Sequence, residues 1–266
     1  MLAAFGASGD PVPLEGGQGS SWVAGEIVLK RLDMTEQELA WLAEVHRSIR
    51  CDGFRVSLPV RTRNDELVVD GWCGWERVSG RHEDGRWPDI IAVGERFHTA
   101  LAGIPRPEFI AARSHQWAIA DRVAWGELPA DRFEEVGHLP RLLAALRPVD
   151  APSQLVHSDL TGNVLFAEGF PPAIIDVSLY WRPPAYASAI VVADALVWEG
   201  AGEDLLETIA HIEDWEQFLL RALIFRAVTD ELFRRQPPGR REDDDPYGPA
   251  AEIAYRCFLK KSTMVS

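Results

Sequence analysis

The sequence pattern changes character once, near residue 80, and this change limits the folds that the chain can adopt. Before it, short β-branched and apolar stretches alternate with turn residues, which predicts strands. After it, apolar residues recur mainly at helical spacing over longer segments. Strands first and helices afterwards indicate an α+β protein, and we expect two lobes, residues 1–78 and residues 79–266.

The N-terminal part is predicted to be a small β-rich lobe with one long helix. The helix is expected to follow Thr35, because Glu38 stands three residues later, as a capping box requires. A short helix is expected within the first ten residues. Strands are expected at residues 12–15, 21–24, 26–32, 54–62 and 66–69, with residues 72–78 continuing the last of them.

The C-terminal part is predicted to be mostly helical. Its strands are expected as two short pieces around a polar loop within residues 155–166 and as one piece at residues 173–177. Residues 236–248 are rich in Pro, Gly, Arg and Asp, which predicts a loop. Helices are expected at residues 89–101, 131–146, 187–199, 205–233 and 250–258.

Composition narrows the class of partner. The formal net charge of −14 disfavours nucleic acid, whose phosphates need basic clusters, and is compatible with a cationic substrate. The apolar stretches are shorter than the roughly 18 residues of a membrane span. The first ten residues lack the basic start of a signal peptide, so we expect a cytoplasmic protein. The three distant cysteines fit reduced thiols, and both a monomer and a homodimer remain open.

Residues 156–166, Val-His-Ser-Asp-Leu-Thr-Gly-Asn-Val-Leu-Phe, carry the strongest chemical signal. They contain Asp159 and Asn163, and Asp176 follows 13 residues after the asparagine. Phosphoryl transfer needs a carboxylate that orients or deprotonates the acceptor hydroxyl, and oxygen ligands that hold Mg²⁺ against the phosphates. Asp159 fits the first role, while Asn163 and Asp176 fit the second. The alternative for the cluster is a loop in which Asp and Asn only cap helices.

With these motifs the chain resembles the aminoglycoside phosphotransferase and choline kinase group, small-molecule relatives of the protein kinases. The resemblance covers nearly the whole chain. It implies a bilobal protein-kinase-like fold, ATP and Mg²⁺ as cofactors, and phosphoryl transfer to a hydroxyl group of a small molecule. It also implies that Asp159 is the catalytic base, that Asn163 and Asp176 bind the metal, and that His157 braces the loop.

The chain departs from the pattern of that group at three points. The group usually places Asn five residues after the catalytic Asp, whereas four residues separate Asp159 from Asn163. Ser158 replaces a common Gly, and Val177 stands where a further acidic or aromatic residue is often found. A nucleotide-binding pseudokinase with a scaffold or regulatory role is therefore the alternative to an active kinase, and nucleotidyl transfer is a third hypothesis.

The N-terminal part holds the residues expected to bind the nucleotide phosphates. Gly16, Gly17 and Gly19, followed by Ser20, lie between two predicted strands, where backbone N–H groups can approach phosphate oxygens. Lys30 follows on the third strand and is one of only three lysines among 27 basic residues. The resemblance implies that its ammonium meets the α- and β-phosphates.

The resemblance further implies a carboxylate on the next helix that holds this lysine. Glu38 is the first candidate, with a purely capping role as its alternative, and Glu44 is the second. Residues 76–78 correspond to the linker whose backbone binds the adenine edge, which adds Glu76 and Val78 to the nucleotide site.

Two further acidic features have a structural and a functional interpretation. Asp194 lies inside an apolar helical segment, and the resemblance favours a brace of the C-terminal lobe. The acidic run at residues 242–245 is typical of a solvated loop, with a clamp for a cationic acceptor as the alternative.

Overall fold

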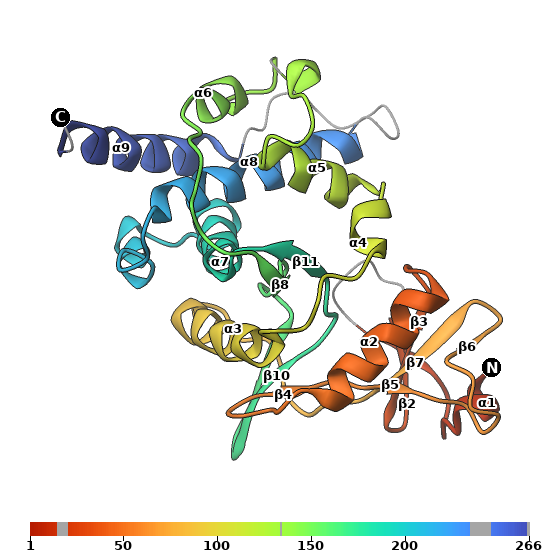
Figure 1. The fold of residues 1–266 in the computed structure, drawn as a ribbon. Coiled ribbons are helices and arrows are strands. Elements are labelled where there is room, and N and C mark those ends of the chain that lie inside the picture. Colours follow the sequence, from red (N-terminus) through yellow and green to blue (C-terminus); the bar gives the residue numbers. More distant parts are fainter. Residues whose placement is uncertain (15–20, 134, 235–245, 265–266) are drawn as a thin grey trace. The chain divides into compact units, whose positions relative to one another are not determined.

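The computed structural model describes residues 1–14, 21–133, 135–234 and 246–264, and Figure 1 shows their helices and strands. It divides the chain into two compact units, which are described in turn. The first unit comprises Met1–His82 together with Asn163–Val177, and the second comprises Glu83–Gly162 together with Ser178–Ser266. The α+β class predicted from the sequence is confirmed.

An antiparallel sheet forms the centre of the first unit. Among the described residues its strand order is β1-β2-β3-β7-β5, and β6 also pairs with β7. The predicted strands at residues 21–24 and 26–32 are confirmed, because β2 and β3 pair from Ser21 opposite Lys30 to Ala24 opposite Ile27. The strands of this sheet are β1 (Val12–Pro13), β2 (Ser21–Ala24), β3 (Ile27–Arg31), β5 (Pro59–Val60), β6 (Val68–Val69) and β7 (Trp72–Glu76).

The predicted continuation of residues 66–69 into residues 72–78 is wrong, because a tight turn separates them. Asp70 and Gly71 both hold positive φ angles, 53° and 74°. This is the backbone of a two-residue hairpin turn, which reverses the chain and pairs Val69 with Trp72. The first residue of the turn is Asp, which tolerates the left-handed region better than most residues.

The strand predicted at residues 54–62 is also wrong as a single element. It divides into β4 (Arg55–Val56) and β5, which belong to different sheets. Ser57 lies at the crossing point: its N–H donates to the Ile174 carbonyl at 3.1 Å, and its hydroxyl donates to the Glu76 carbonyl at 2.7 Å. The two bonds connect the sheets through one residue.

The hairpin of β9 (Val164–Ala167) and β10 (Phe170–Ile174) belongs to the first unit because β10 pairs in parallel with β4. Figure 1 labels β4 and β10 of this sheet. The predicted lobe boundary after residue 78 stays a prediction. The compact units differ from it, since residues 163–177 pack with the N-terminal residues although they lie far along the chain.

Two helices complete the first unit. The short α1 (Leu2–Phe5) agrees with the predicted lead-in helix. The longer α2 (Glu36–Ser48) begins after Thr35 as predicted and buries Leu39 and Leu42. The capping box satisfies two backbone donors at its start, which fixes where the helix begins.

In the second unit α7 (Pro184–Trp198) is the central helix. It is buried along most of its length and packs on α3 (Trp87–Leu101), α8 (Trp215–Arg234), α9 (Gly248–Met264) and β8 (Gln154–His157). β8 pairs with β11 (Leu179–Arg182), and the register places Tyr180 opposite Val156. Tyr186 and Phe225 are fully buried in this core, in agreement with the apolar sequence of the region.

Several helices of the second unit differ from the prediction. The described part of residues 131–146 is not one helix: it contains η1 (Asp131–Phe133) and α6 (Leu139–Ala144), and Gly137 has a positive φ between them. Residues 205–233 are not one helix: η2 (Glu203–Thr208) precedes α8, and Asp214 holds φ at 54°, which a continuous right-handed helix does not accommodate. α4 (Phe109–Ala112) and α5 (Gln116–Ala124) lie in a region that the sequence pattern left unassigned. None of the helices in the described ranges is long and apolar enough to cross a membrane.

Candidate active site

Lys30 and Asp176 form an ion pair in the first unit. Lys30 lies on β3, where its side chain leaves the sheet, and Asp176 follows β10. The ammonium Nζ is 2.6 Å from Oδ1 of the aspartate. The two side chains remain 21% and 53% exposed, so solvent screens the attraction and the pair contributes little to folding stability. A pair of this kind can open for a ligand at low cost.

The backbone at Asp176 adopts a left-handed conformation. Its φ is +50°, in a region that residues other than Gly, Asn and Asp rarely adopt. The preceding Ile175 donates its N–H to the carbonyl of Asn163 at 3.0 Å, and Ile174 pairs with Val164. Asn163 and Asp176 therefore stand at the paired ends of one hairpin.

The chemistry of these residues fits Mg²⁺. An amide oxygen and a carboxylate are hard oxygen ligands, and Mg²⁺ is held by one or two carboxylates while it keeps waters and substrate phosphates. Within the described part of the chain, no group of three or more His, Cys, Asp or Glu residues is placed to hold a metal.

Asp33 is a carboxylate near this pair that sequence reasoning missed. It stands two residues beyond the end of β3, the strand that carries Lys30. Packing around its carboxyl group raises its pKa, the charge of Asp176 raises it further, and the charge of Lys30 lowers it. Two carboxylates therefore act on the one ammonium. In the sequence, the feature that could have indicated this residue is an acidic side chain shortly after the strand that carries the lysine.

Glu38 closes the capping box of α2. The N–H of Thr35 donates to Oε2 of Glu38 at 2.9 Å, and the N–H of Glu38 donates to Oγ1 of Thr35 at 3.1 Å. This confirms the capping interpretation, and an ion pair with Lys30 stays a prediction. The second candidate, Glu44, lies 2.9 Å from the guanidinium of Arg47 on the surface of the same helix.

The other predicted nucleotide-binding residues fall into two groups. Gly16, Gly17, Gly19 and Ser20 lie outside the described residues, as does the acidic run at residues 242–245. The described strands on either side of the glycine segment are joined by a hydrogen bond from the Leu14 N–H to the Ser21 carbonyl, 2.9 Å long.

The linker residues differ in how their backbone groups are used. The N–H of Glu76 donates to the Leu58 carbonyl at 2.8 Å, and the Glu76 carbonyl accepts from the Ser57 hydroxyl. Val78 forms no hydrogen bond with any residue that the structure describes. The adenine-binding role of both residues stays a prediction, and Val78 has the freer backbone for it.

Asp159 lies in the second unit, where a buried arginine holds it. Arg226 of α8 donates to Oδ1 of Asp159 at 2.8 Å, and it makes two hydrogen bonds, 2.7 and 2.6 Å long, to the carboxylate of Asp194. Asp194 is almost fully buried, and the loss of solvent raises its pKa while the arginine lowers it. The structural role predicted for Asp194 is confirmed.

The Arg226 guanidinium leaves part of the Asp159 carboxylate open. Asp159 remains 47% exposed, whereas Arg226 is 10% exposed. Burial alone would lower the pKa of Arg226, but the charges of Asp194 and Asp159 raise it, so it stays a cation. In the sequence, the feature that could have indicated the role of Arg226 is a charged residue inside the apolar stretch of α8.

Two histidines support the segment that carries Asp159. Nδ1 of His157 accepts the N–H groups of Asp159 at 3.3 Å and Ser178 at 3.4 Å, which confirms its predicted bracing role. The N–H of His157 donates in turn to Nε2 of His98, 3.0 Å away on α3. Burial and the neighbouring His157 lower the pKa of His98 to about 3, so it is neutral and can accept this bond.

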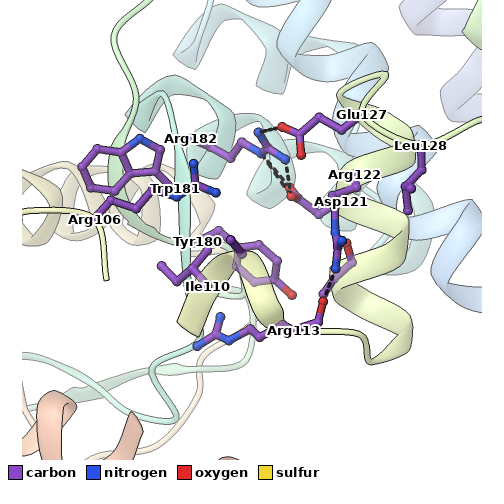
Figure 2. Close-up of a pocket in the computed structure, with 12 residues that line it drawn as sticks. Arg106, Ile110, Arg113, Asp121, Arg122, Glu127, Leu128, Tyr180, Trp181 and Arg182 are labelled. Atoms are coloured by element: carbon purple, nitrogen blue, oxygen red, sulfur yellow. Dashed lines mark hydrogen bonds and ion pairs between the residues drawn. The ribbon is translucent and has the colours of Figure 1, made fainter. Parts of the chain in front are cut away.

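A cavity of about 230 Å³ opens in the second unit beside β11 (Figure 2). Arg182 lies on one wall and makes hydrogen bonds to both carboxylate oxygens of Asp121 and an ion pair with Glu127. Figure 2 shows Arg113 on the other side of the Tyr180 ring, and the guanidinium carbon of Arg113 is 5.9 Å from the centre of that ring. Sequence reasoning did not find this cavity, because its walls come from segments distant in the chain.

Comparison with known proteins gives structural neighbours only. No protein-family model and no curated protein matches the chain. A spectinomycin phosphotransferase in complex with ADP and spectinomycin is similar in structure, with a TM-score of 0.56, 16% identity and coverage of 92% of each chain. A choline/ethanolamine kinase family protein from Mesorhizobium loti has a TM-score of 0.52 and 17% identity, covering 96% of this chain and 88% of its own.

A third neighbour is a thermostable mutant of an aminoglycoside phosphotransferase, solved with hygromycin B and a nucleotide. Its complex with ADP has a TM-score of 0.55 and 14% identity, covering 97% of this chain and 96% of its own. In that complex an aspartate is replaced by alanine, and in the complex with AMP-PNP the asparagine four positions later is replaced. At these identities the likeness is one of fold. The chain therefore has the α+β, protein-kinase-like fold found in aminoglycoside phosphotransferases and in a choline/ethanolamine kinase family protein.

Proposed function

We propose that this protein is an ATP- and Mg²⁺-dependent phosphotransferase that acts on a hydroxyl group of a small molecule. The single observation that carries the proposal is the Lys30–Asp176 ion pair, in which an aspartate with a left-handed backbone meets the ammonium of the central sheet. Its fold neighbours are phosphotransferases solved with ADP or AMP-PNP. An ammonium beside a metal-type carboxylate suits bound nucleotide phosphates.

Each residue then has a role that its contacts support. Lys30 leaves Asp176 and binds the α- and β-phosphates, which frees the carboxylate to hold the cation together with Asn163. Bound Mg²⁺ would neutralise phosphate charge and orient the γ-phosphoryl group. Asp159 accepts a hydrogen bond, and then the proton, from the acceptor hydroxyl. The acceptor oxygen forms the new bond to phosphorus as the bond to the bridging oxygen of ADP breaks.

Arg226 positions Asp159 in this scheme. Its hydrogen bond to Oδ1 restricts the rotation of the carboxylate.

The proposal is tested by charge-removing substitutions in a coupled assay of ADP formation with a broad set of hydroxylated metabolites. Asp159→Asn is expected to lower kcat roughly a hundredfold to ten-thousandfold, the usual contribution of a general base. Asp176→Asn is expected to lower it on the order of a hundredfold or more, because a metal ligand loses its charge. Asn tolerates the left-handed backbone, so the fold is retained.

Asp70→Asn is the matched control, since Asp70 also holds a left-handed φ, of 53°, in a surface turn. It is expected to keep full activity. Full transfer activity in Asp159→Asn or Asp176→Asn would refute the assignment of roles.

The alternative is a nucleotide-binding pseudokinase with a scaffold or regulatory role. The observation in its favour is the Arg226 guanidinium on Asp159, because a fixed cation opposes the transfer of a proton to that carboxylate. This alternative predicts that Mg-ATP binds, in isothermal titration calorimetry, while neither slow ATP hydrolysis nor transfer to any acceptor occurs. Measured transfer that depends on Asp159 would exclude it.

A further inference from the structure

The cavity beside β11 has an excess of positive charge. Four of its lining residues are arginines, Arg106, Arg113, Arg122 and Arg182, and two are carboxylates, Asp121 and Glu127. The lining thus carries a formal charge of +2 in a chain whose net charge is −14. A basic cavity in an acidic protein is not explained by overall composition.

The carboxylates of the cavity are already engaged. Both oxygens of Asp121 accept hydrogen bonds from Arg182, and Glu127 pairs with the same guanidinium. Burial alone would lower the pKa of Arg182, but these two carboxylates raise it, so the group is a permanent cation that holds both acids. These three residues together leave one negative charge.

Two of the remaining arginines, Arg122 and Arg106, have no hydrogen bond to a carboxylate among the described residues. Arg122 donates to the carbonyls of Ala118 and Arg113, which are neutral acceptors. Arg106 is exposed at the cavity and has no hydrogen bond or ion pair with any residue in the described ranges. Guanidinium groups present several N–H donors in a planar fork that matches the oxygens of a carboxylate or a phosphate.

Strand β11 connects the cavity to the segment that carries Asp159. Tyr180 and Trp181 line the cavity from β11, and the β11–β8 register places Tyr180 opposite Val156 and Leu179 opposite His157. Asp159 stands only two residues beyond the end of β8. The negative charge of Asp159 also contributes to the raised pKa of Tyr180, after burial and Asp121. The side chain of Tyr180 thus lines the cavity and senses the charge of the proposed catalytic base.

We propose that the cavity binds the acceptor and that the acceptor is a compact anion, a hydroxylated compound with a carboxylate or phosphate group. This inference rests on the proposed function and replaces the expectation of a cationic acceptor. The cavity is below the roughly 300–1,000 Å³ of sites for drug-sized ligands, which favours a single ring or short chain. Arg106 and Arg122 bind the anionic group, and Trp181 and Ile110 contact the carbon skeleton.

The first test compares six-carbon sugar derivatives that carry different charges. Phosphoryl transfer from labelled ATP is measured with gluconate, glucose 6-phosphate, glucose and glucosamine, which carry a carboxylate, a phosphate, no charge and an ammonium. We expect kcat/KM for one of the two anions to exceed that for glucose and glucosamine at least about tenfold, the effect of one charged hydrogen bond. The two anionic arms separate a carboxylate from a phosphate.

The second test removes one cation from the cavity. Arg106→Gln is expected to raise KM for the preferred anion about tenfold with little change in kcat, and to leave KM for glucose unchanged. Arg96→Gln is the matched control. Arg96 is exposed on α3 and does not line the cavity, so this substitution removes the same charge at a different place. Equal effects of the two variants, or a preference for glucosamine, would overturn the inference.

The outcomes also separate this inference from the proposed function. Transfer to neutral or cationic acceptors, unaffected by Arg106→Gln, would leave a phosphotransferase with a different acceptor site. Calorimetric binding of gluconate or glucose 6-phosphate that is lost in Arg106→Gln, without transfer to any acceptor, would keep the anion site and reject the phosphotransferase.

Discussion

The hydrogen bond between His98 and the backbone of His157 makes the stability of the second unit dependent on pH in a calculable way. His98 accepts this bond only while it is neutral, and its buried position lowers its pKa from 6.5 to about 3. Between these values the unfolded chain binds a proton that the folded chain excludes. Stability is therefore complete above pH 6.5 and is lost as the pH falls toward 3.

The magnitude follows from the two pKa values. Each pH unit below 6.5 costs about 1.4 kcal/mol, so the loss at pH 5.0 is about 2 kcal/mol relative to pH 7.5. His98→Gln removes the titration and keeps an acceptor, since the Gln side-chain oxygen can take the place of Nε2. Between pH 7.5 and pH 5.0, the free energy of unfolding of the variant is expected to fall by about 2 kcal/mol less than that of the native protein.

The assay is urea unfolding at pH 7.5 and pH 5.0, followed by circular dichroism and by tryptophan fluorescence. Buried carboxyl groups with raised pKa values, such as those of Asp121 and Asp194, have the opposite effect, because their protonation stabilises the folded state as the pH falls. They are common to both proteins, so the difference between native and variant isolates the histidine. An identical pH dependence in the two proteins would refute the reasoning.

Two further changes test the packing around Asp159. Gly94→Ala on α3 would place a Cβ atom 2.5 Å from Cδ1 of the buried Leu160. We expect thermal unfolding to show a free energy of unfolding that is lower by about 1–3 kcal/mol, despite the better helix propensity of Ala. The Gly94→Ala/Leu160→Ala double variant is expected to recover stability, because it removes the atom that clashes. Arg226→Met leaves the Asp194 carboxylate buried without its partner and is expected to cost about 3–5 kcal/mol. Adding Asp194→Leu should restore most of that stability in urea unfolding, and a double variant no more stable than Arg226→Met would contradict the assigned role of the ion pair.

Local sequence rules predicted the elements that depend on neighbouring residues. The start of α2 follows from Thr35 and Glu38, whose capping box needs only a spacing of three. The pairing of β2 with β3 follows from two strands with a short turn at Gly25. The bracing role of His157 is equally local, because the backbone N–H that it accepts from Asp159 is two residues away.

Contacts between distant segments could not be read in the same way. The pattern of residues 54–62 does not reveal that β4 pairs with β10 while β5 pairs with β7. Nor does any local rule connect Arg226 with Asp159, or Asp176 with the ammonium of Lys30. These pairs are set by how the sheets and helices pack. The charged side chains were visible in the sequence, and only their partners were hidden.

The left-handed backbone of Asp176 restricts how this position can vary in evolution. Glu keeps the same charge, but in this backbone conformation it would cost about 1–2 kcal/mol more than a residue that tolerates positive φ. Gly and Asn relieve the cost and give up the charge. The main chain therefore disfavours a longer carboxylate at this position, whatever the charge of the side chain.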